Sequence, residues 1–241
     1  MTARYMPEIF SVPDLAQARA IILTPEGPGG DTETRWAHET PYLRDLIQAQ
    51  LGLRPGHVLI DFGCGVGRLA KPLIEATGCS VIGVDISPEM RALAMDYVGS
   101  DRFLAVSPAQ LDFLTKAGLR AEAAIAIWVL QHCLDPAKEI ARIECSLAPG
   151  GGCFVLNMPK RAIPALLEQG GARSFAWASD GVDVAALLRG QFEPGATGVA
   201  GGPGVPHMGD VGAYWMRLHR RAPATGRAMA GLPPSAAAKA T

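Results

Sequence analysis

From residue 57 to residue 157, short and continuously apolar runs alternate with segments of helical character. Continuous apolar runs are typical of strands that are buried on both faces of a sheet. Strands that alternate with helices pair in parallel, because each helix returns the chain across the sheet. The pattern predicts a doubly wound, mostly parallel α/β sheet, with strands at residues 57–62, 80–85, 102–106, 122–128 and 153–157.

The rest of the chain divides around this region. Residues 1–55 are predicted to form an N-terminal helical cover, with helices at 15–23 and 39–51, the second capped by Thr40 with Pro41 at its first position. The sheet domain spans 56–221 and ends in an antiparallel strand at 213–220. Residues 222–241, rich in Ala, Pro, Gly and Ser, are predicted to be a disordered tail. Further helices are predicted at 68–77, 88–98, 135–148 and 182–188.

Charge and composition narrow the classes of partner. Lys and Arg total 22 against 23 Asp and Glu, so no long-range attraction to nucleic acid or to an anionic membrane is expected. The sequence shows neither a secretory signal nor a membrane-spanning run. Five scattered cysteines form no metal-binding pattern. These features predict a cytoplasmic protein without a metal that acts on a small molecule, and they specify no oligomeric state.

A glycine-rich turn follows the first predicted strand, in the segment Asp61-Phe-Gly-Cys-Gly-Val-Gly-Arg68. Glycine permits positive φ and has no Cβ, so a ligand can lie directly against the backbone. The turn is expected at the carboxyl edge of the sheet, where open α/β folds bind ligands. Asp85 closes the next strand, where its carboxylate can accept hydrogen bonds from both hydroxyls of a ribose. Together the two features predict a nucleoside-containing cofactor.

The identity of the cofactor depends on the residue after the third glycine of the turn. The dinucleotide fingerprint requires glycine at position 68, where this chain has Arg68. A turn that need not hold a pyrophosphate suits a nucleoside with an amino-acid tail. An NAD(P)-dependent dehydrogenase therefore remains only an alternative.

Three linked motifs resemble those of the class I S-adenosylmethionine-dependent methyltransferases. They are the segments 58–67 and 84–90, and residues 128–132 taken with the run Leu147-Ala-Pro-Gly-Gly151, which resembles the small-molecule branch. The resemblance covers about residues 56–158. It implies a Rossmann-like fold and S-adenosylmethionine as cofactor. It also implies methyl transfer to an oxygen or nitrogen of a small acceptor by in-line displacement.

The resemblance also assigns positions in the cofactor site. Gly63 and Gly65 would lie against the methionine part, and Asp85 would hold the ribose. The adenine would be flanked by Ile86 and Met90. The remaining positions assigned to the cofactor site are Asp61, Gly67, Ser107, Pro108, Ile127 and Trp128. The family often has an acid after the third strand, where this chain has Ser107, so the adenine contact departs from the family pattern.

Methyl transfer needs a general base only if the nucleophile arrives protonated. His132, just after the fourth strand, is the candidate base; the alternative is a structural role in which its ring bonds the backbone at the start of the next segment. In the N-terminal cover, Arg35 is placed to meet the cofactor carboxylate and Trp36 to meet a flat substrate. A binding or assembly protein that performs no transfer is a second alternative, because few polar residues follow the fourth strand.

Overall fold

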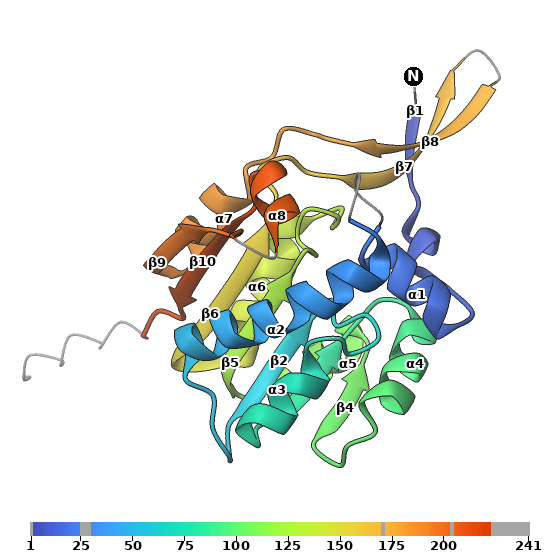
Figure 1. Cartoon of the computed structure of the whole chain (residues 1–241). Helices are drawn as coiled ribbons and strands as arrows, with labels where there is room; N and C mark the ends of the chain where they lie inside the picture. Colours follow the sequence, from blue (N-terminus) through green and yellow to red (C-terminus); the bar gives the residue numbers. More distant parts are fainter. Residues whose placement is uncertain (1, 25–29, 170–171, 203–204, 223–241) are drawn as a thin grey trace, which may run out of the picture.

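A computed structural model describes residues 2–24, 30–169, 172–202 and 205–222. Its main sheet has seven strands in the order β4-β3-β2-β5-β6-β10-β9 (Figure 1). The first five strands in this order are parallel, and β10 is antiparallel to both of its neighbours. The bounds are β2 Val58–Phe62, β3 Ser80–Val84, β4 Phe103–Val106, β5 Ala121–Ile127, β6 Leu147–Asn157, β9 Glu193–Val199 and β10 Tyr214–His219. The predicted Rossmann-like fold and the antiparallel terminal strand are confirmed.

Helices cover both faces of this sheet and bury two apolar cores. One core packs α2, α3 and α4 against one face, and the other packs α5, α6 and α7 against the opposite face. These helices are α2 Thr32–Leu51, α3 Ala70–Thr77, α4 Pro88–Val98, α5 Pro108–Lys116, α6 Pro136–Ser146 and α7 Val184–Gln191. A short helix, α8 Pro206–Asp210, precedes β10. Because both faces are covered, ligands can reach the sheet at the ends of its strands.

The start of α2 differs from the prediction. The helix begins at Thr32, where the side chain of Asp31 accepts a hydrogen bond from the backbone N–H of Thr34, and Pro41 lies inside it. Thr40 and Pro41 suggested a helix start because proline lacks an N–H and suits a first turn. In the structure the burial of Leu43 and Ile47 under α2 offsets the hydrogen bond that proline removes.

A second, three-stranded sheet lies beyond the main one, in the order β1-β7-β8 (Figure 1). Strand β1 Thr2–Tyr5 pairs antiparallel with β7 Ile163–Gln169, which pairs with β8 Ala172–Ala178. The N-terminal segment, predicted to be helical, therefore contains a strand as well as η1 Pro7–Phe10 and α1 Leu15–Ile22. This sheet escaped prediction because it joins two segments that lie about 160 residues apart, as the pairing of Tyr5 with Ala165 shows.

Two further predictions concern the C-terminal tail and membrane-spanning segments. The predicted tail from residue 223 onward lies outside the described residues. In the described part of the chain, no helix combines the length and apolar character that crossing a bilayer requires.

Candidate active site

A cavity of about 830 Å³ opens at the carboxyl ends of β2, β3 and β5. It is bounded on the other side by residues of β1, η1, α1 and β8. Eleven of the fourteen predicted site residues line it: Arg35, Asp61, Gly63, Gly65, Asp85, Ile86, Met90, Pro108, Ile127, Trp128 and His132. Segments that are distant in the sequence thus meet at the predicted edge of the sheet.

The glycine turn has the backbone conformation that its sequence predicts. Gly63 has φ 76° and Gly65 has φ 53°, in the left-handed region that side chains rarely adopt. A Cβ on Gly63 would lie 2.4 Å from a methyl group of Val129, and one on Gly65 would lie 2.7 Å from Ile22. Both positions therefore require glycine. The space that a Cβ would take is occupied by the side chains of Val129 and Ile22, which pack onto the turn.

Two carboxylates lie at the carboxyl ends of the adjacent strands β2 and β3: Asp61 is within the last residues of β2, and Asp85 directly follows β3. Asp85 accepts hydrogen bonds from the backbone N–H groups of Gly65 at 3.0 Å and Ser87 at 2.9 Å. Burial raises its pKa. Asp61 is 3% exposed, and its Oδ2 atom has no hydrogen-bond partner among the described residues. Burial, with a smaller contribution from the charge of Asp85, raises the pKa of Asp61 to about 7.

These residues fit a nucleoside that carries an amino-acid tail. Each oxygen of Asp85 accepts one backbone hydrogen bond and keeps a lone pair that can accept from a ribose hydroxyl. The unpartnered oxygen of Asp61 offers an acceptor for an ammonium group. Past Asp85, the cavity wall is formed by the apolar side chains of Ile86, Met90 and Pro108, which suit a flat base.

The other three predicted site residues lie outside the cavity wall. Gly67 has φ 78° and packs closely against Val98 of α4. Ser107 caps α5, since its hydroxyl accepts a hydrogen bond from the N–H of Gln110. Trp36 lies under the guanidinium of Arg19, 4.5 Å from the ring centroid, and meets Tyr97 edge-on. Their contacts in this structure are thus with the protein itself.

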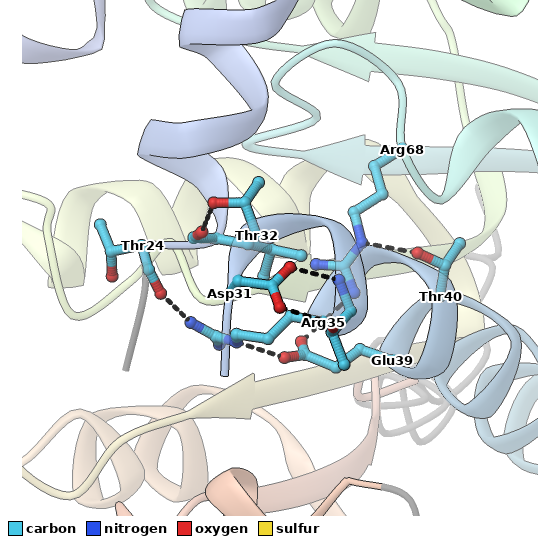
Figure 2. A network of polar contacts seen from close by, with 9 residues as sticks. Thr24, Asp31, Thr32, Arg35, Glu39, Thr40 and Arg68 are labelled. Atoms are coloured by element: carbon cyan, nitrogen blue, oxygen red, sulfur yellow. Dashed lines mark hydrogen bonds and ion pairs between the residues drawn. The ribbon is translucent and has the colours of Figure 1, made fainter. Parts of the chain in front are cut away.

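A buried ionic network joins α2 to Arg68, the residue that follows the glycine turn in the sequence (Figure 2). Arg35 donates to Glu39 at 2.6 Å and to the carbonyl of Thr24 at 2.6 Å. Arg68 donates to the other oxygen of Glu39 at 3.3 Å and to Thr40 at 2.9 Å. Arg68, where a dinucleotide-binding protein has glycine, therefore ties the turn to α2 (Figure 2). This contact explains why the turn departs from the dinucleotide pattern.

His132 also lines the cavity. Its Nδ1 lies 2.6 Å from the carbonyl oxygen of Ala162, the backbone contact that formed the alternative interpretation, and its Nε2 lies 3.2 Å from the amide nitrogen of Gln131. Burial lowers the pKa of the His132 imidazole, so at neutral pH the ring is uncharged. An uncharged imidazole has the lone pair that a general base requires.

Aromatic rings from the second sheet and η1 surround His132. The centroid of Trp177 on β8 lies 5.2 Å from the His132 ring, and that of Phe10 lies 5.8 Å from it. The two rings also contact each other, with centroids 6.4 Å apart. We call Phe10, His132 and Trp177 the aromatic wall. Phe10 and Trp177 were missed in the sequence, because no local pattern joins them to His132.

Trp128 directly follows β5 and has a strained backbone conformation. Its φ of 61° is the only positive value for a residue other than glycine in the described part of the chain. Its indole N–H is buried and has no partner among the described residues. Such strain often marks functional sites. Here it turns the chain so that Trp128 and Val129 both face the cavity.

Comparison with known proteins places this site in a family. Residues 35–184 match the family model described as a methyltransferase domain. The ubiquinone biosynthesis O-methyltransferase of Coxiella burnetii (strain Dugway 5J108-111) is 31% identical over 115 residues, which are 47% of this chain and 48% of that protein. The chain thus spans about half the length of the curated relatives it matches.

Solved structures share the fold at low sequence identity. The N-methyltransferase NodS of Bradyrhizobium japonicum WM9, in complex with S-adenosylhomocysteine, has a TM-score of 0.56 and 13% identity over 85% of this chain and 97% of its own. The cyclase SpnF has a TM-score of 0.56 and 20% identity over 76% of this chain and 82% of its own. The fold therefore serves more than one reaction, and the acceptor must be argued from the site.

Proposed function

This chain belongs to the methyltransferase-domain family, with S-adenosylmethionine as its cofactor, and we propose that it methylates a hydroxyl oxygen on a small aromatic acceptor. The observation that carries the proposal is the position of His132, an uncharged base in the same cavity as the glycine turn. The similarity to an O-methyltransferase supports oxygen as the nucleophile. The cofactor supplies a methyl group already activated on a sulfonium.

The cofactor half of the cavity is assigned to the residues at the ends of β2 and β3. Asp85 would hold the ribose hydroxyls, and Asp61 would face the ammonium of the amino-acid tail. Arg35, which also lines the cavity, would lie near the carboxylate of that tail. Held in this way, the methyl group would be aligned with the acceptor and shielded from water, and this alignment would be the main contribution of the protein to such a displacement.

His132 suits the role of base better than the other titratable groups near it. Burial raises the pKa of Tyr5 to about 12 and that of Cys133 to about 12, so both stay protonated at neutral pH. Glu139 is ion-paired with Arg142. His132 is unprotonated on Nε2, and because burial weakens it as a base, a phenol, whose pKa is about 10 as in tyrosine, suits it better than a less acidic aliphatic hydroxyl.

The aromatic wall supports an aromatic acceptor. A flat ring packs well against aromatic side chains, and each such pair contributes about 0.5–1.5 kcal/mol beyond its buried area. When bound, S-adenosylmethionine would supply an activated methyl group, whose carbon would bond to the acceptor oxygen while the carbon–sulfur bond broke and the electron pair of that bond stayed on sulfur. The hydroxyl proton passes to His132 Nε2 and then to solvent. The products are a methyl ether and S-adenosylhomocysteine.

Transfer of a labelled methyl group tests the proposal. The purified protein would be incubated with methyl-labelled S-adenosylmethionine and a phenol, an ortho-diphenol, a benzoate and an aromatic amine in parallel. We expect label on a phenolic oxygen, and a loss of about 10²–10⁴-fold in kcat for His132→Ala. His38→Ala, which changes an exposed histidine of α2, is the matched control and should keep full activity.

Three outcomes would contradict this assignment. Label on the amine or the carboxylate alone would reject the hydroxyl acceptor, and full turnover by His132→Ala would reject the base. Tight binding of S-adenosylhomocysteine without transfer to any acceptor would instead favour a binding or assembly role.

A further inference from the structure

Gln131 is a buried polar residue that directly precedes the candidate base. Its side chain is 3% exposed, and both ends of the amide are engaged. The oxygen Oε1 accepts a hydrogen bond from the backbone N–H of Met158 at 2.9 Å, and Nε2 lies 3.2 Å from Nε2 of His132. Its backbone carbonyl accepts from the N–H of Ala162 at 3.0 Å. Gln131 therefore ties the end of β5 to the segment that leads from β6 to β7.

These contacts have a fixed direction. A backbone N–H can only donate, so the amide oxygen of Gln131 must face Met158 and its NH₂ group must face His132. Nε2 of His132 then has to accept. At the other side of the ring the partner is the carbonyl of Ala162, which can only accept, so Nδ1 must carry the proton. The series of hydrogen bonds from Met158 through Gln131 and His132 to Ala162 thus selects one tautomer of the neutral imidazole.

The same arrangement disfavours a charged ring. A proton on Nε2 would point at the N–H of Gln131, and that amide cannot turn without leaving Met158 unpaired. The charged group Arg161 acts in the same direction on the charged imidazole. Other titratable groups that line this end of the cavity are Tyr5 of β1, the neighbouring Cys133, and Asp135, Lys138 and Glu139 at the start of α6.

We propose that Gln131 is a positioning residue, which holds His132 as the Nδ1–H tautomer with its Nε2 lone pair directed to the acceptor hydroxyl. The effect of Gln131 on catalysis rests on the proposed function, whereas the selection of the His132 tautomer does not. When the acceptor binds, its hydroxyl takes the place of the Gln131 N–H as donor to Nε2. Of the three contacts that link Met158, Gln131, His132 and Ala162, the one between Gln131 and His132 is the longest, at 3.2 Å. It is the contact that the acceptor hydroxyl would replace.

Nitrogen NMR of the cofactor-free protein tests the tautomer without any activity. Uniformly ¹⁵N-labelled protein would give signals for five histidines, and His132→Gln would identify the one in question. We expect the Nδ1–H tautomer for His132 at pH 7.5. The Nε2–H tautomer, or fast exchange between the two, would overturn the inference.

Gln131→Glu tests the direction of the amide. A carboxylate still accepts from Met158 but can also accept from a protonated Nε2, so it should raise the pKa of His132 by one unit or more. The acid limb of the pH profile of kcat/KM should move to higher pH by the same amount. At pH values below the pKa of His132, kcat/KM should therefore be roughly tenfold lower than in the wild type. Gln17→Glu, an exposed change on α1, adds the same charge elsewhere and should move neither.

A purely structural role for Gln131 would lower the melting temperature and leave the His132 titration where it is, and that result would overturn the inference. If Gln131→Glu fails to fold, Gln131→Met keeps the bulk of the side chain. It should lower kcat, because the ring loses the contact at Nε2 that positions it, while KM for the cofactor is unchanged. Failure of the proposed function is distinguishable, because absent phenol methylation alongside a fixed Nδ1–H tautomer would reject the reaction and keep the positioning.

Discussion

The backbone N–H of Gly65 donates a hydrogen bond of 3.0 Å to the carboxylate of Asp85, so the glycine turn and the end of β3 share one polar contact. The second oxygen of Asp85 accepts from Ser87, at the start of α4. One carboxylate thus sets the turn, the strand end and the helix start relative to one another. It does so beside the space assigned to the ribose.

Replacing Asp85 should weaken cofactor binding. We expect Asp85→Ala to raise the dissociation constant for S-adenosylhomocysteine by about ten- to a hundredfold, because losing hydrogen bonds to a charged group costs roughly 1.5–3 kcal/mol. Calorimetric titration measures this directly. Asp101→Ala, an exposed change before β4, should bind normally. An unchanged constant in Asp85→Ala would show that this carboxylate does not hold the ribose.

Asp61 should make the stability of the cofactor-free protein depend on pH. Its pKa of about 7 lies above that of an unfolded chain, so folding takes up a proton. The stabilising contribution is complete below the unfolded pKa of about 4 and is lost as the pH rises through about 7. A pKa difference of about three units corresponds to at most about 4 kcal/mol. We expect Asp61→Asn to remove this loss.

Urea unfolding at pH 5 and pH 8 compares the variants. The wild type should lose more stability between these values than Asp61→Asn does, and the difference between the two isolates Asp61 from other titrating groups. Asp96→Asn, an exposed change on α4, should follow the wild type. Parallel curves for Asp61→Asn and the wild type would show that the carboxyl of Asp61 titrates normally.

The main sheet was predictable because its signals are local. Each parallel strand is a short, largely apolar run, as in Val58–Phe62, and the helices α4, α5 and α6 are each capped by a local side chain, Ser87, Ser107 and Asp135 respectively. The second sheet was not predictable, because β1 has only four residues and its hydrogen-bond partners lie in β7, far away in the sequence. The start of α2 was wrong because Pro41 imitates a first turn, and only tertiary burial shows it to be internal.

The site divides in the same way. Asp85 and the turn glycines were found because strand ends and glycine spacing appear in the sequence. His132 was found because it follows a strand, and the contact of its Nδ1 with Ala162 was foreseen as the alternative. Phe10 and Trp177 required the structure, because the nearness of their rings is set by the pairing of β1 and β8 with β7.

Removing Glu39 should destabilise the fold. Glu39 is fully buried between Arg35 and Arg68, and removing one partner from a buried charge network costs about 3–5 kcal/mol. Glu39→Ala should therefore lower the free energy of unfolding by that amount. Glu33→Ala, on the exposed face of the same helix, breaks a surface pair with Arg19 and should cost less than about 1 kcal/mol. Equal losses in the two variants would mean that the network is not what stabilises α2.

Shortening Trp177 should separate acceptor binding from cofactor binding. Trp177 is 44% exposed and contacts both Phe10 and His132, so it contributes to the aromatic wall more than to the core. Loss of one aromatic contact, worth about 0.5–1.5 kcal/mol, should raise KM for a phenolic acceptor by about two- to tenfold in Trp177→Leu. The dissociation constant for S-adenosylhomocysteine should stay unchanged, because the aromatic contacts of Trp177 are with Phe10, His132 and Phe175 and not with the residues assigned to the cofactor. Phe113→Leu, an exposed change on α5, is the matched control. A rise in the cofactor constant with no change in the acceptor KM would place the acceptor away from the aromatic wall.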